Sequence, residues 1–391
     1  MSEPANSPAS VRAAVAAGSV ITLFGHRLLH LPGTGLAAVR WPRPWAADLR
    51  PPWHYWWQAH YLDCLVDAGW REHRSGLPPA ALRLGHQLLR GIRLRNLGRY
   101  PNLYYDDMAW LALAAGRLDE LARAVTGAGT RQSRAVIDVL APRLISASTD
   151  DAGGGVFWNT RRTFKNTAAT APAALFFARA GEPERTRALT DWLRDRLLDP
   201  DSGLYLDGVR LGRRGVETVR SRYTYNQGPV LGALLALGDP ADLDAAARLV
   251  DAVDAGLTRP SPVVAGAKVL ITHGGGDGGL FTGILVRYLA AVAIDARLPP
   301  TARSTAARLV TGTADALWTG RRRVPPGESR SAEGPGDGAL IFSADAGVDA
   351  ATSYPLGGPV ELSTQLQAWM SLEAAAVCVG GTAAEDSTSV V

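Results

Sequence analysis

The chain has 391 residues, of which 47% are hydrophobic and 20% are charged. This composition is typical of a folded globular protein with a sizeable core, and it excludes disorder over most of the length. The net charge of +4 comes mostly from scattered arginines rather than from a basic patch with interleaved aromatic residues, so nucleic acid is not an expected partner.

Residues 1–45 are predicted to form an N-terminal extension of the folded domain. Its start, residues 1–10, is polar, and residues 11–30 have the pattern of an amphipathic helix that carries Arg12 and Arg27. A Pro-rich connector follows, because prolines at this density interrupt a continuous helix. The charged side chains argue against a signal peptide and a membrane span. We therefore expect a cytoplasmic protein, and we expect it to be a monomer.

Residues 46–380 are predicted to form one domain of repeated helices. The pattern places these helices at residues 53–66, 78–95, 105–115, 131–145, 168–180, 183–198, 225–237, 241–257, 280–296, 301–317 and 362–379. Because strands do not alternate with helices, the sequence indicates an all-α fold in which paired antiparallel helices close into a toroid. The best candidate for a short hairpin is 203–208, and residues 381–391 are predicted to form a flexible tail.

Two adjacent carboxylates, Asp106 and Asp107, stand between two tyrosines and Trp110, just before an apolar helical run. Neighbouring carboxyls raise each other's cost of ionisation, so their surroundings can leave one protonated and the other charged at neutral pH. Glycoside hydrolases use such a pair, one carboxyl as proton donor and the other as nucleophile or base. The alternative is that the two aspartates only cap the helix or form a solvated face.

Four further stretches are rich in side chains that could contact a ligand. They are 56–60 with Trp57 and Gln58, 154–167 with Trp158, Asn159, Lys165 and Asn166, 223–228 with Tyr223, Tyr225, Asn226 and Gln227, and 273–284 with Asp277 and Phe281. Aromatic rings beside amide donors and acceptors are what a hydroxyl-rich ligand requires. Each also has a structural alternative: a core tryptophan, a surface lysine, a capping turn or, for Asp277, a helix cap. A metal pair of His273 with Asp277 lacks a third ligand, so no metal site is predicted.

Taken in order, these stretches resemble glycoside hydrolase family 76, the endo-α-1,6-mannanase family, whose hallmark Tyr-Tyr-Asp-Asp-x-x-Trp is matched by residues 104–110. The resemblance covers about residues 53–300. It implies an (α/α)6 barrel and a retaining mechanism on α-1,6-linked mannose backbones, with no metal or cofactor. It makes Asp106 the nucleophile and Asp107 the general acid/base. The residues that it suggests for carbohydrate binding are Trp57, Gln58, Tyr104, Tyr105, Trp158, Asn159, Lys165, Asn166, Tyr223, Tyr225, Asn226, Gln227, Asp277 and Phe281.

The sequence departs from the family pattern at Leu103, where a polar residue is common, and at Phe157, where a tryptophan is usual. Two alternatives to a hydrolase stay open. One is a transglycosylase or another sugar-active α/α-barrel enzyme; a transglycosylase would share every catalytic residue with a hydrolase. The other is a glycan-binding scaffold that has lost its activity.

Overall fold

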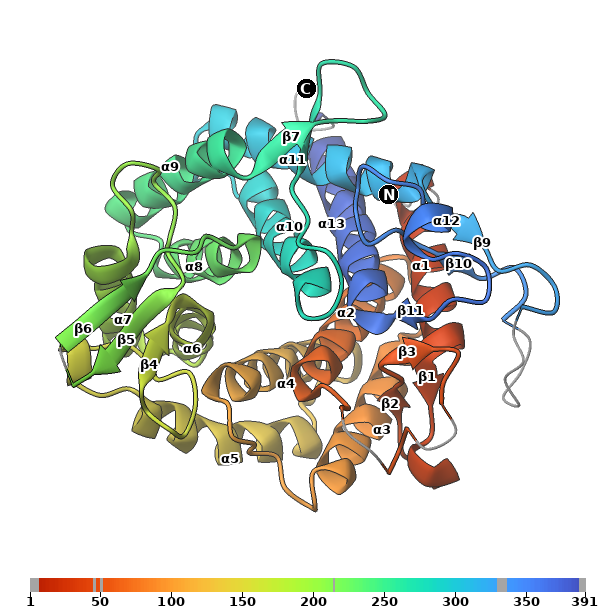
Figure 1. The fold of residues 1–391 in the computed structure, drawn as a ribbon, viewed down its shortest axis with the longest axis horizontal. Helices are drawn as coiled ribbons and strands as arrows, with labels where there is room; N and C mark the ends of the chain where they lie inside the picture. The colour runs from red at the N-terminus through yellow and green to blue at the C-terminus, as the bar shows by residue number, and fades with distance from the viewer. Residues whose placement is uncertain (1–6, 45–46, 50–51, 214, 329–335, 387–391) are drawn as a thin grey trace.

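The structure, a computed structural model, describes residues 7–44, 47–49, 52–213, 215–328 and 336–386, the last six of them by their backbone alone. These residues form two concentric rings of helices, as the view along the ring axis shows (Figure 1). The prediction of an all-α fold is therefore confirmed. Residues 1–6 and 387–391, at the ends of the predicted extension and tail, lie outside the described part of the chain.

The inner ring consists of six helices, and each packs against the next one around the axis. They are α2 (Tyr55–Arg74), α4 (Tyr105–Thr126), α6 (Thr167–Arg179), α8 (Thr224–Leu237), α10 (Gly278–Ile294) and α13 (Leu362–Asp386). The last of them, α13, packs back against α2 and closes the ring. Small residues permit this close approach: a side chain at Gly283 of α10 would collide with the backbone of Gln367 in α13.

The outer ring supplies one helix beside each inner helix. Its members are α1 (Pro8–Phe24), α3 (Ala80–Arg95), α5 (Arg131–Ala147), α7 (Pro183–Leu197), α9 (Pro240–Gly256) and α11 (Pro300–Thr319). Four of these six helices begin with a proline, a residue tolerated where a helix start leaves the N–H without a partner. The two rings together are an (α/α)6 barrel.

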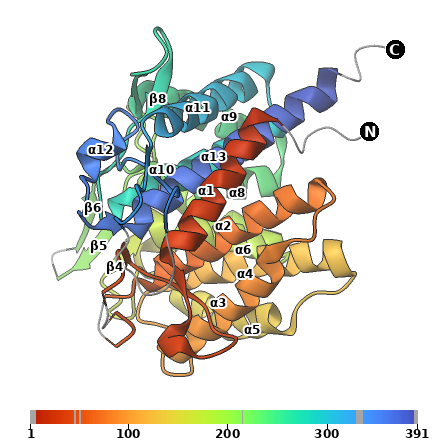
Figure 2. The ribbon, with the colours of Figure 1, turned by 90° about the vertical axis from the view of Figure 1, so that its right-hand side faces the viewer.

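The first helix belongs to the barrel rather than to an extension of it. Helix α1 packs against α13 and α2, and its residues Ala13, Ala16 and Val20 are buried in the common core. Figure 2 shows α1 lying along α13. The folded unit therefore begins near Pro8, whereas the sequence analysis placed its start at residue 46. An Ala-rich helix with few large apolar residues gave too weak a periodic signal for its packing to be predicted.

The two ends of the barrel differ in their connections. At one end, short loops join the inner helices α2, α4, α6, α8 and α10 to the outer helix that follows each of them. At the other end, which we call the mouth, long loops lead into the inner helices, so all six inner helices start there. Long loops on a rigid scaffold are where function usually lies.

All of the short strands described in the structure lie in the mouth loops. They are β1 (Gly25–His26), β2 (Leu36–Ala37), β3 (Arg40–Trp41), β4 (Phe164–Asn166), β5 (Gly208–Gly212), β6 (Gly215–Val219), β7 (Thr258–Pro260), β8 (Lys268–Leu270), β9 (Arg322–Arg323), β10 (Leu340–Ile341) and β11 (Val360–Glu361). Three short helices, Leu28–His30, Asp151–Gly153 and α12 (Ala350–Ser353), lie in the same loops. The hairpin predicted at 203–208 is wrong, because β5 begins where that segment ends and pairs antiparallel with β6 and β4.

No helix in the described ranges is long and apolar enough to cross a membrane. The described residues also contain no group of three or more His, Cys, Asp or Glu side chains that could hold a metal ion.

Candidate active site

The adjacent aspartates lie at the mouth, at the start of inner helix α4. Asp106 and Asp107 are the second and third residues of this helix, and no side chain caps its first turn. The unpaired amides of a helix start, and the positive end of its dipole, favour negative charge. The backbone N–H of Asp107 donates to Oδ1 of Asp106 at 2.9 Å. The helix itself thus stabilises a carboxylate at Asp106.

The second oxygen of Asp106 is held by a tryptophan from another loop. Trp158 lies between α5 and α6, and its indole Nε1 donates to Oδ2 of Asp106 at 2.9 Å. The same loop is fastened to the start of α4, because the N–H of Tyr105 donates to the carbonyl of Trp158 at 2.8 Å and Tyr104 pairs with Asn159. Both carboxylate oxygens of Asp106 therefore accept hydrogen bonds, which fixes the orientation of the side chain.

Asp107 has a different partner, Asn102, in the loop that precedes α4. The Nδ2 of Asn102 donates to Oδ2 of Asp107. The Oδ1 of Asn102 accepts a hydrogen bond from the N–H of Tyr104 at 2.9 Å. Because an N–H can donate only to the amide oxygen, this second bond orients the amide so that its NH₂ group faces Asp107.

Burial at the mouth raises the pKa of both carboxyls. Burial raises the pKa of Asp106 to about 7, although the N–H of Asp107 and the indole of Trp158 act in the opposite direction. Burial raises the pKa of Asp107 well above its usual range, the charge of Asp106 adds to this, and donation from Asn102 opposes it. Two carboxyls that repel each other lose their protons in two steps. Near neutral pH the pair therefore holds a proton, which Asp107 keeps more strongly.

A third carboxylate, Asp277, faces the same mouth from the start of α10. Its Oδ1 accepts hydrogen bonds from the indole Nε1 of Trp56 and of Trp57, each at 3.0 Å. Its side chain is 58% exposed, so it can also contact a ligand. The charge of Asp277 contributes to the raised pKa of both Asp106 and Asp107. The prediction that Asp277 lies at the site is thus consistent with its position, and Trp57 acts by holding it.

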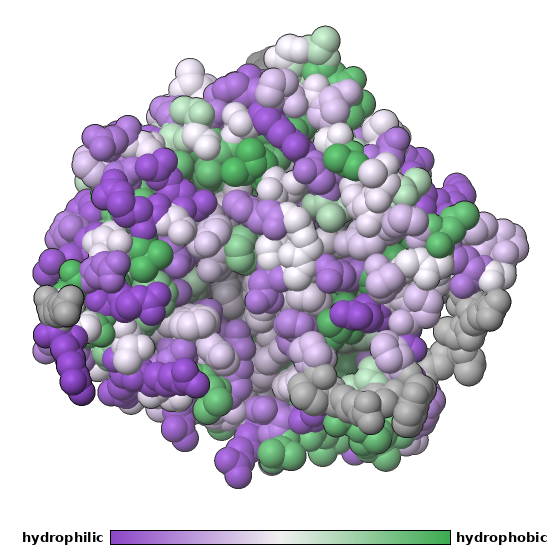
Figure 3. Space-filling model, in the orientation of Figure 1, coloured by the Kyte–Doolittle hydropathy of each residue, from purple (hydrophilic) through white to green (hydrophobic). Residues whose placement is uncertain are grey.

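Aromatic rings form one wall of the mouth. The rings of Tyr225 and Phe281 stack with their centroids 4.0 Å apart, and Tyr223 lies against Phe281 at 5.4 Å. Trp56 adjoins the same ring at 6.3 Å. Figure 3 shows this face of the molecule hollowed near its middle. Aromatic walls with a few well-placed polar groups are typical of small-molecule sites.

Two glutamines predicted to bind the substrate instead hold the mouth loops. Both amide atoms of Gln58 bond to the backbone N–H and carbonyl of Ala37, each at 2.9 Å. Gln227 does the same with Tyr205, at 2.9 and 3.0 Å. Both side chains are buried. With their polar atoms bonded to backbone groups, these residues fix loop positions and are not placed to contact a sugar.

Lys165 and Asn166, which were also predicted to bind the substrate, likewise hold a mouth loop. Lys165 is fully buried, and its Nζ donates to the carbonyls of Thr149 and Gly154 and to Oγ1 of Thr149, at 2.6, 2.7 and 3.0 Å. These contacts occupy all three donors of the ammonium group. The Oδ1 of Asn166 accepts from the N–H of Ala169 at 3.1 Å and caps α6. Both residues fasten the loop that carries Trp158.

The other residues predicted to bind carbohydrate differ in their exposure. Tyr104, Trp158, Asn159, Tyr223, Tyr225 and Phe281 are exposed or half-buried in the mouth loops or at the helix starts beside them, whereas Tyr105 and Asn226 are buried. Asn226 donates weakly to Asp207, at 3.5 Å.

Sequence reasoning missed three residues of the site. Asn102 holds Asp107, Trp56 holds Asp277 with Trp57, and Asp207 lies beside Asn226, with a pKa that burial raises. Asn102 and Trp56 stand inside stretches that the sequence analysis singled out, so proximity in sequence was an available signal. Asp207 lies inside the segment 203–208, which was interpreted as a hairpin, and no pattern in the sequence marked it as a site residue.

Comparisons with known proteins point to one family. Residues 38–328 match the profile of glycosyl hydrolase family 76. No curated protein matches the chain with significance. Among solved structures, the α-1,6-mannanase GH76A of Salegentibacter sp. HEL1_6 is 28% identical, with a TM-score of 0.74 over 94% of this chain and 99% of that one.

Two further structures are similar. One is an inactive variant of the same Salegentibacter enzyme in complex with α-1,6-mannotriose, in which two consecutive aspartates are replaced by asparagine; it is 27% identical, with a TM-score of 0.73 over 94% of this chain and 99% of that one. The other, the Lin0763 protein of Listeria innocua, is 24% identical with a TM-score of 0.73 over 94% and 97% of the two chains, which supports the fold alone. The chain belongs to glycosyl hydrolase family 76 and is a glycosidase.

Proposed function

We propose that this glycosidase cleaves α-1,6-linked mannose backbones internally and with retention of configuration. Asp106 acts as the nucleophile and Asp107 as the general acid/base. The observation that carries the proposal is the pair itself: two adjacent carboxyls at one helix start, with different hydrogen-bond partners and raised pKa values. The similar Salegentibacter enzyme is an α-1,6-mannanase, and replacing two consecutive aspartates inactivates it.

In the first step, Asp107 gives its proton to the glycosidic oxygen as the bond from this oxygen to the anomeric carbon breaks. Asp106 attacks the anomeric carbon and forms a covalent glycosyl ester. The hydrogen bonds from Trp158 and from the N–H of Asp107 direct the carboxylate of Asp106. The high pKa of Asp107 keeps its proton available at neutral pH.

In the second step, Asp107 is ionised and takes a proton from water, whose oxygen attacks the anomeric carbon and releases Asp106. The loss of negative charge on the esterified Asp106 removes the repulsion that raised the pKa of Asp107. The pKa of Asp107 therefore falls in the intermediate, although burial still raises it, and this fall suits the change from acid to base. If a sugar hydroxyl replaces water, the same residues perform glycosyl transfer.

The test is a time course of the purified protein with linear α-1,6-mannooligosaccharides, followed by proton NMR and by product size. Shorter products that first appear as the α-anomer are expected, and internal cleavage gives several sizes at once. A β-anomer as first product would overturn the retaining assignment. Products longer than the substrate would favour transglycosylation, and binding without cleavage would favour the scaffold alternative.

A pH profile can test the role of Asn102. Its N–H donation favours the ionised form of Asp107, so Asn102→Ala should raise the pKa of the general acid. Activity requires the protonated acid and is lost above its pKa. The alkaline limb of kcat/KM is therefore expected to move to higher pH by about 1–2 units, since a hydrogen bond to a charged group contributes about 1.5–3 kcal/mol.

The matched control is Asn96→Ala. Asn96 Nδ2 donates to the carbonyls of Arg99 and Pro101, so it supports the same loop without touching Asp107. This variant is expected to lower kcat without moving the alkaline limb. An unmoved limb in Asn102→Ala would show that Asn102 only supports the loop.

A further inference from the structure

The end of the barrel opposite the mouth contains a cavity of about 330 Å³ that plays no part in the proposed mechanism. Four arginines line it, from four different inner-ring positions, together with two carboxylates. The charged lining residues are Arg74, Arg117, Arg179, Arg287, Asp67 and Glu373. The charge of the cavity depends on which of these guanidinium groups are neutralised by a carboxylate.

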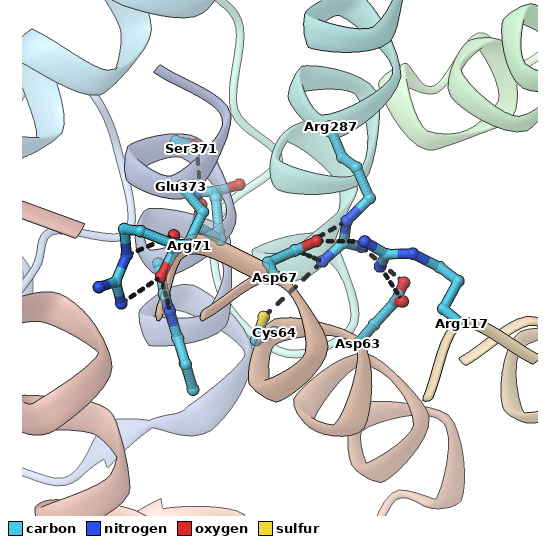
Figure 4. Close-up of polar contacts among 10 residues, drawn as sticks. Asp63, Cys64, Asp67, Arg71, Arg117, Arg287, Ser371 and Glu373 are labelled. Atoms are coloured by element: carbon cyan, nitrogen blue, oxygen red, sulfur yellow. Dashed lines mark hydrogen bonds and ion pairs between the residues drawn. The ribbon is translucent and has the colours of Figure 1, made fainter. Parts of the chain in front are cut away.

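Two of the four arginines are neutralised within the barrel. Arg117 and Arg287 both bind the carboxylates of Asp63 and Asp67, which face them from helix α2 (Figure 4). Arg287 lies 2.8 Å from Asp63 and 2.5 Å from Asp67. These four largely buried side chains form a closed ring of charges whose sum is zero.

The second lining carboxylate is also taken. Arg71 forms a two-pronged ion pair with Glu373, at 2.9 and 3.0 Å (Figure 4). Trp369 donates its indole N–H to the same carboxylate at 3.1 Å. Glu373 therefore has its own counter-charge and does not neutralise a further arginine.

Arg74 and Arg179 remain. Both residues line the cavity and are exposed, and neither guanidinium forms an ion pair or donates a hydrogen bond within the described ranges of the chain. Partial burial lowers the pKa of Arg74, and the more distant charges of Glu373 and Asp67 only partly oppose this. The adjoining hollow that shares Arg179 holds Asp295, but Arg297 binds that carboxylate at 2.6 Å. The cavity thus carries two positive charges in excess.

The other walls are aromatic or apolar: Trp70, Tyr288, Met370 and Ile294 line the same space. Guanidinium forks match the oxygens of phosphate groups, which they bind with two parallel hydrogen bonds. A cavity of this volume, at the lower bound for small-molecule sites, has room for more than a bare phosphate. Aromatic walls beside the arginines suit the apolar face of a small ring that carries the phosphate.

From this arrangement we propose a binding site for a phosphate group, free or carried by a small sugar, at the closed end of the barrel. Arg74 and Arg179 bind the phosphate oxygens, and Trp70 and Tyr288 contact the remainder of the ligand. The buried ring of Asp63, Asp67, Arg117 and Arg287 provides a neutral, rigid floor. The alternative is that Arg74 and Arg179 have only a structural role, in which each interacts with the negative dipole end of its own helix, α2 or α6.

The experiment measures the melting temperature and the binding isotherm of the full chain at low ionic strength, because salt screens exposed charges. The probes are inorganic phosphate, glucose 6-phosphate and, as neutral control, glucose; sodium chloride at matched ionic strength controls for general screening. Saturable stabilisation by phosphate is expected. Tighter binding of glucose 6-phosphate would identify a sugar phosphate as the ligand, and equal binding would identify free phosphate.

Arg74→Gln and Arg179→Gln are each expected to weaken phosphate binding at least about tenfold, which corresponds to the loss of one charge-assisted hydrogen bond. Arg83→Gln is the matched control, because Arg83 is an exposed arginine on outer helix α3. No saturable binding, or an equal loss in all three variants, would overturn the proposal. The assay uses no mannan, so its outcome is independent of the proposed catalytic function.

Discussion

Replacing Asp106 with asparagine is expected to lower the turnover of α-1,6-mannooligosaccharides by at least about 10³-fold, within the range seen when a catalytic group is removed. The amide oxygen of asparagine can still accept one of the two hydrogen bonds that hold Asp106, from Trp158 or from the N–H of Asp107, but the amide NH₂ cannot accept the other. The substitution keeps the size of the side chain and removes a buried charge, so folding should be preserved. Because burial raises the pKa of Asp106, its charge destabilises the folded state at neutral pH, and the variant should be at least as stable as the parent.

Asp107→Asn is the informative companion to this variant. It should lose comparable activity on natural linkages but regain the first step on a mannoside with a good leaving group, which needs no proton donor. Asp106→Asn should not be rescued in this way. Turnover is measured by product release and folding by circular dichroism. Full activity of Asp106→Asn would remove it as the nucleophile, and rescue of the wrong variant would exchange the two roles.

The second large effect is expected at the closed end of the barrel. Asp63→Asn breaks the buried ring of charges and leaves Arg117 and Arg287 to share Asp67, with one positive charge uncompensated. Breaking a buried ion pair from one side costs about 3–5 kcal/mol of the free energy of unfolding. Urea unfolding at pH 7 is the measurement. The midpoint should fall, whereas the activity of the folded fraction at saturating substrate should change little.

This contribution also depends on pH. Burial alone would raise the pKa of Asp63, but Arg117 and Arg287 outweigh burial and leave it lowered to about 2. A carboxyl whose folded-state pKa is below its unfolded value of 3.8 stabilises the protein above that value, and this stability is lost as pH falls toward 2. The difference between parent and variant should therefore shrink below pH 4.

Asp191→Asn is the control for this stability measurement. Asp191 pairs with Arg194 on the surface of α7, where the two side chains are 37% and 53% exposed. Exposed pairs contribute less than about 1 kcal/mol. If Asp63→Asn costs no more than Asp191→Asn, the buried ring does not stabilise the barrel.

The sequence predicted most of the barrel because its helices carry local signals. Apolar periodicity and the order of aromatic and amide stretches led to an α/α fold and to glycoside hydrolase family 76, and both are confirmed. The position of Asp106 and Asp107 at a helix start also follows from the sequence, since aspartates favour the first turn.

What the sequence could not give is the partner of each polar side chain. Gln58, Lys165 and Gln227 have the donors and acceptors that a sugar needs, but the same groups serve equally well to bind loop backbone. Which of the two occurs depends on how loops distant in sequence meet at the mouth. The ring of Asp63, Asp67, Arg117 and Arg287 was equally hidden, because it joins three helices that are far apart along the chain.

The packing of α13 between α10 and α2, beside the first helix, has a consequence for how the protein is made. During synthesis, five inner helices can be complete while the ring is still open, with the core faces of α1, α2 and α10 exposed to water. The barrel closes only when the last inner helix has been translated, so its closing contacts join the two ends of the chain. Contacts of such long sequence separation form slowly. Until then, the nascent chain presents apolar surface of the kind that molecular chaperones bind.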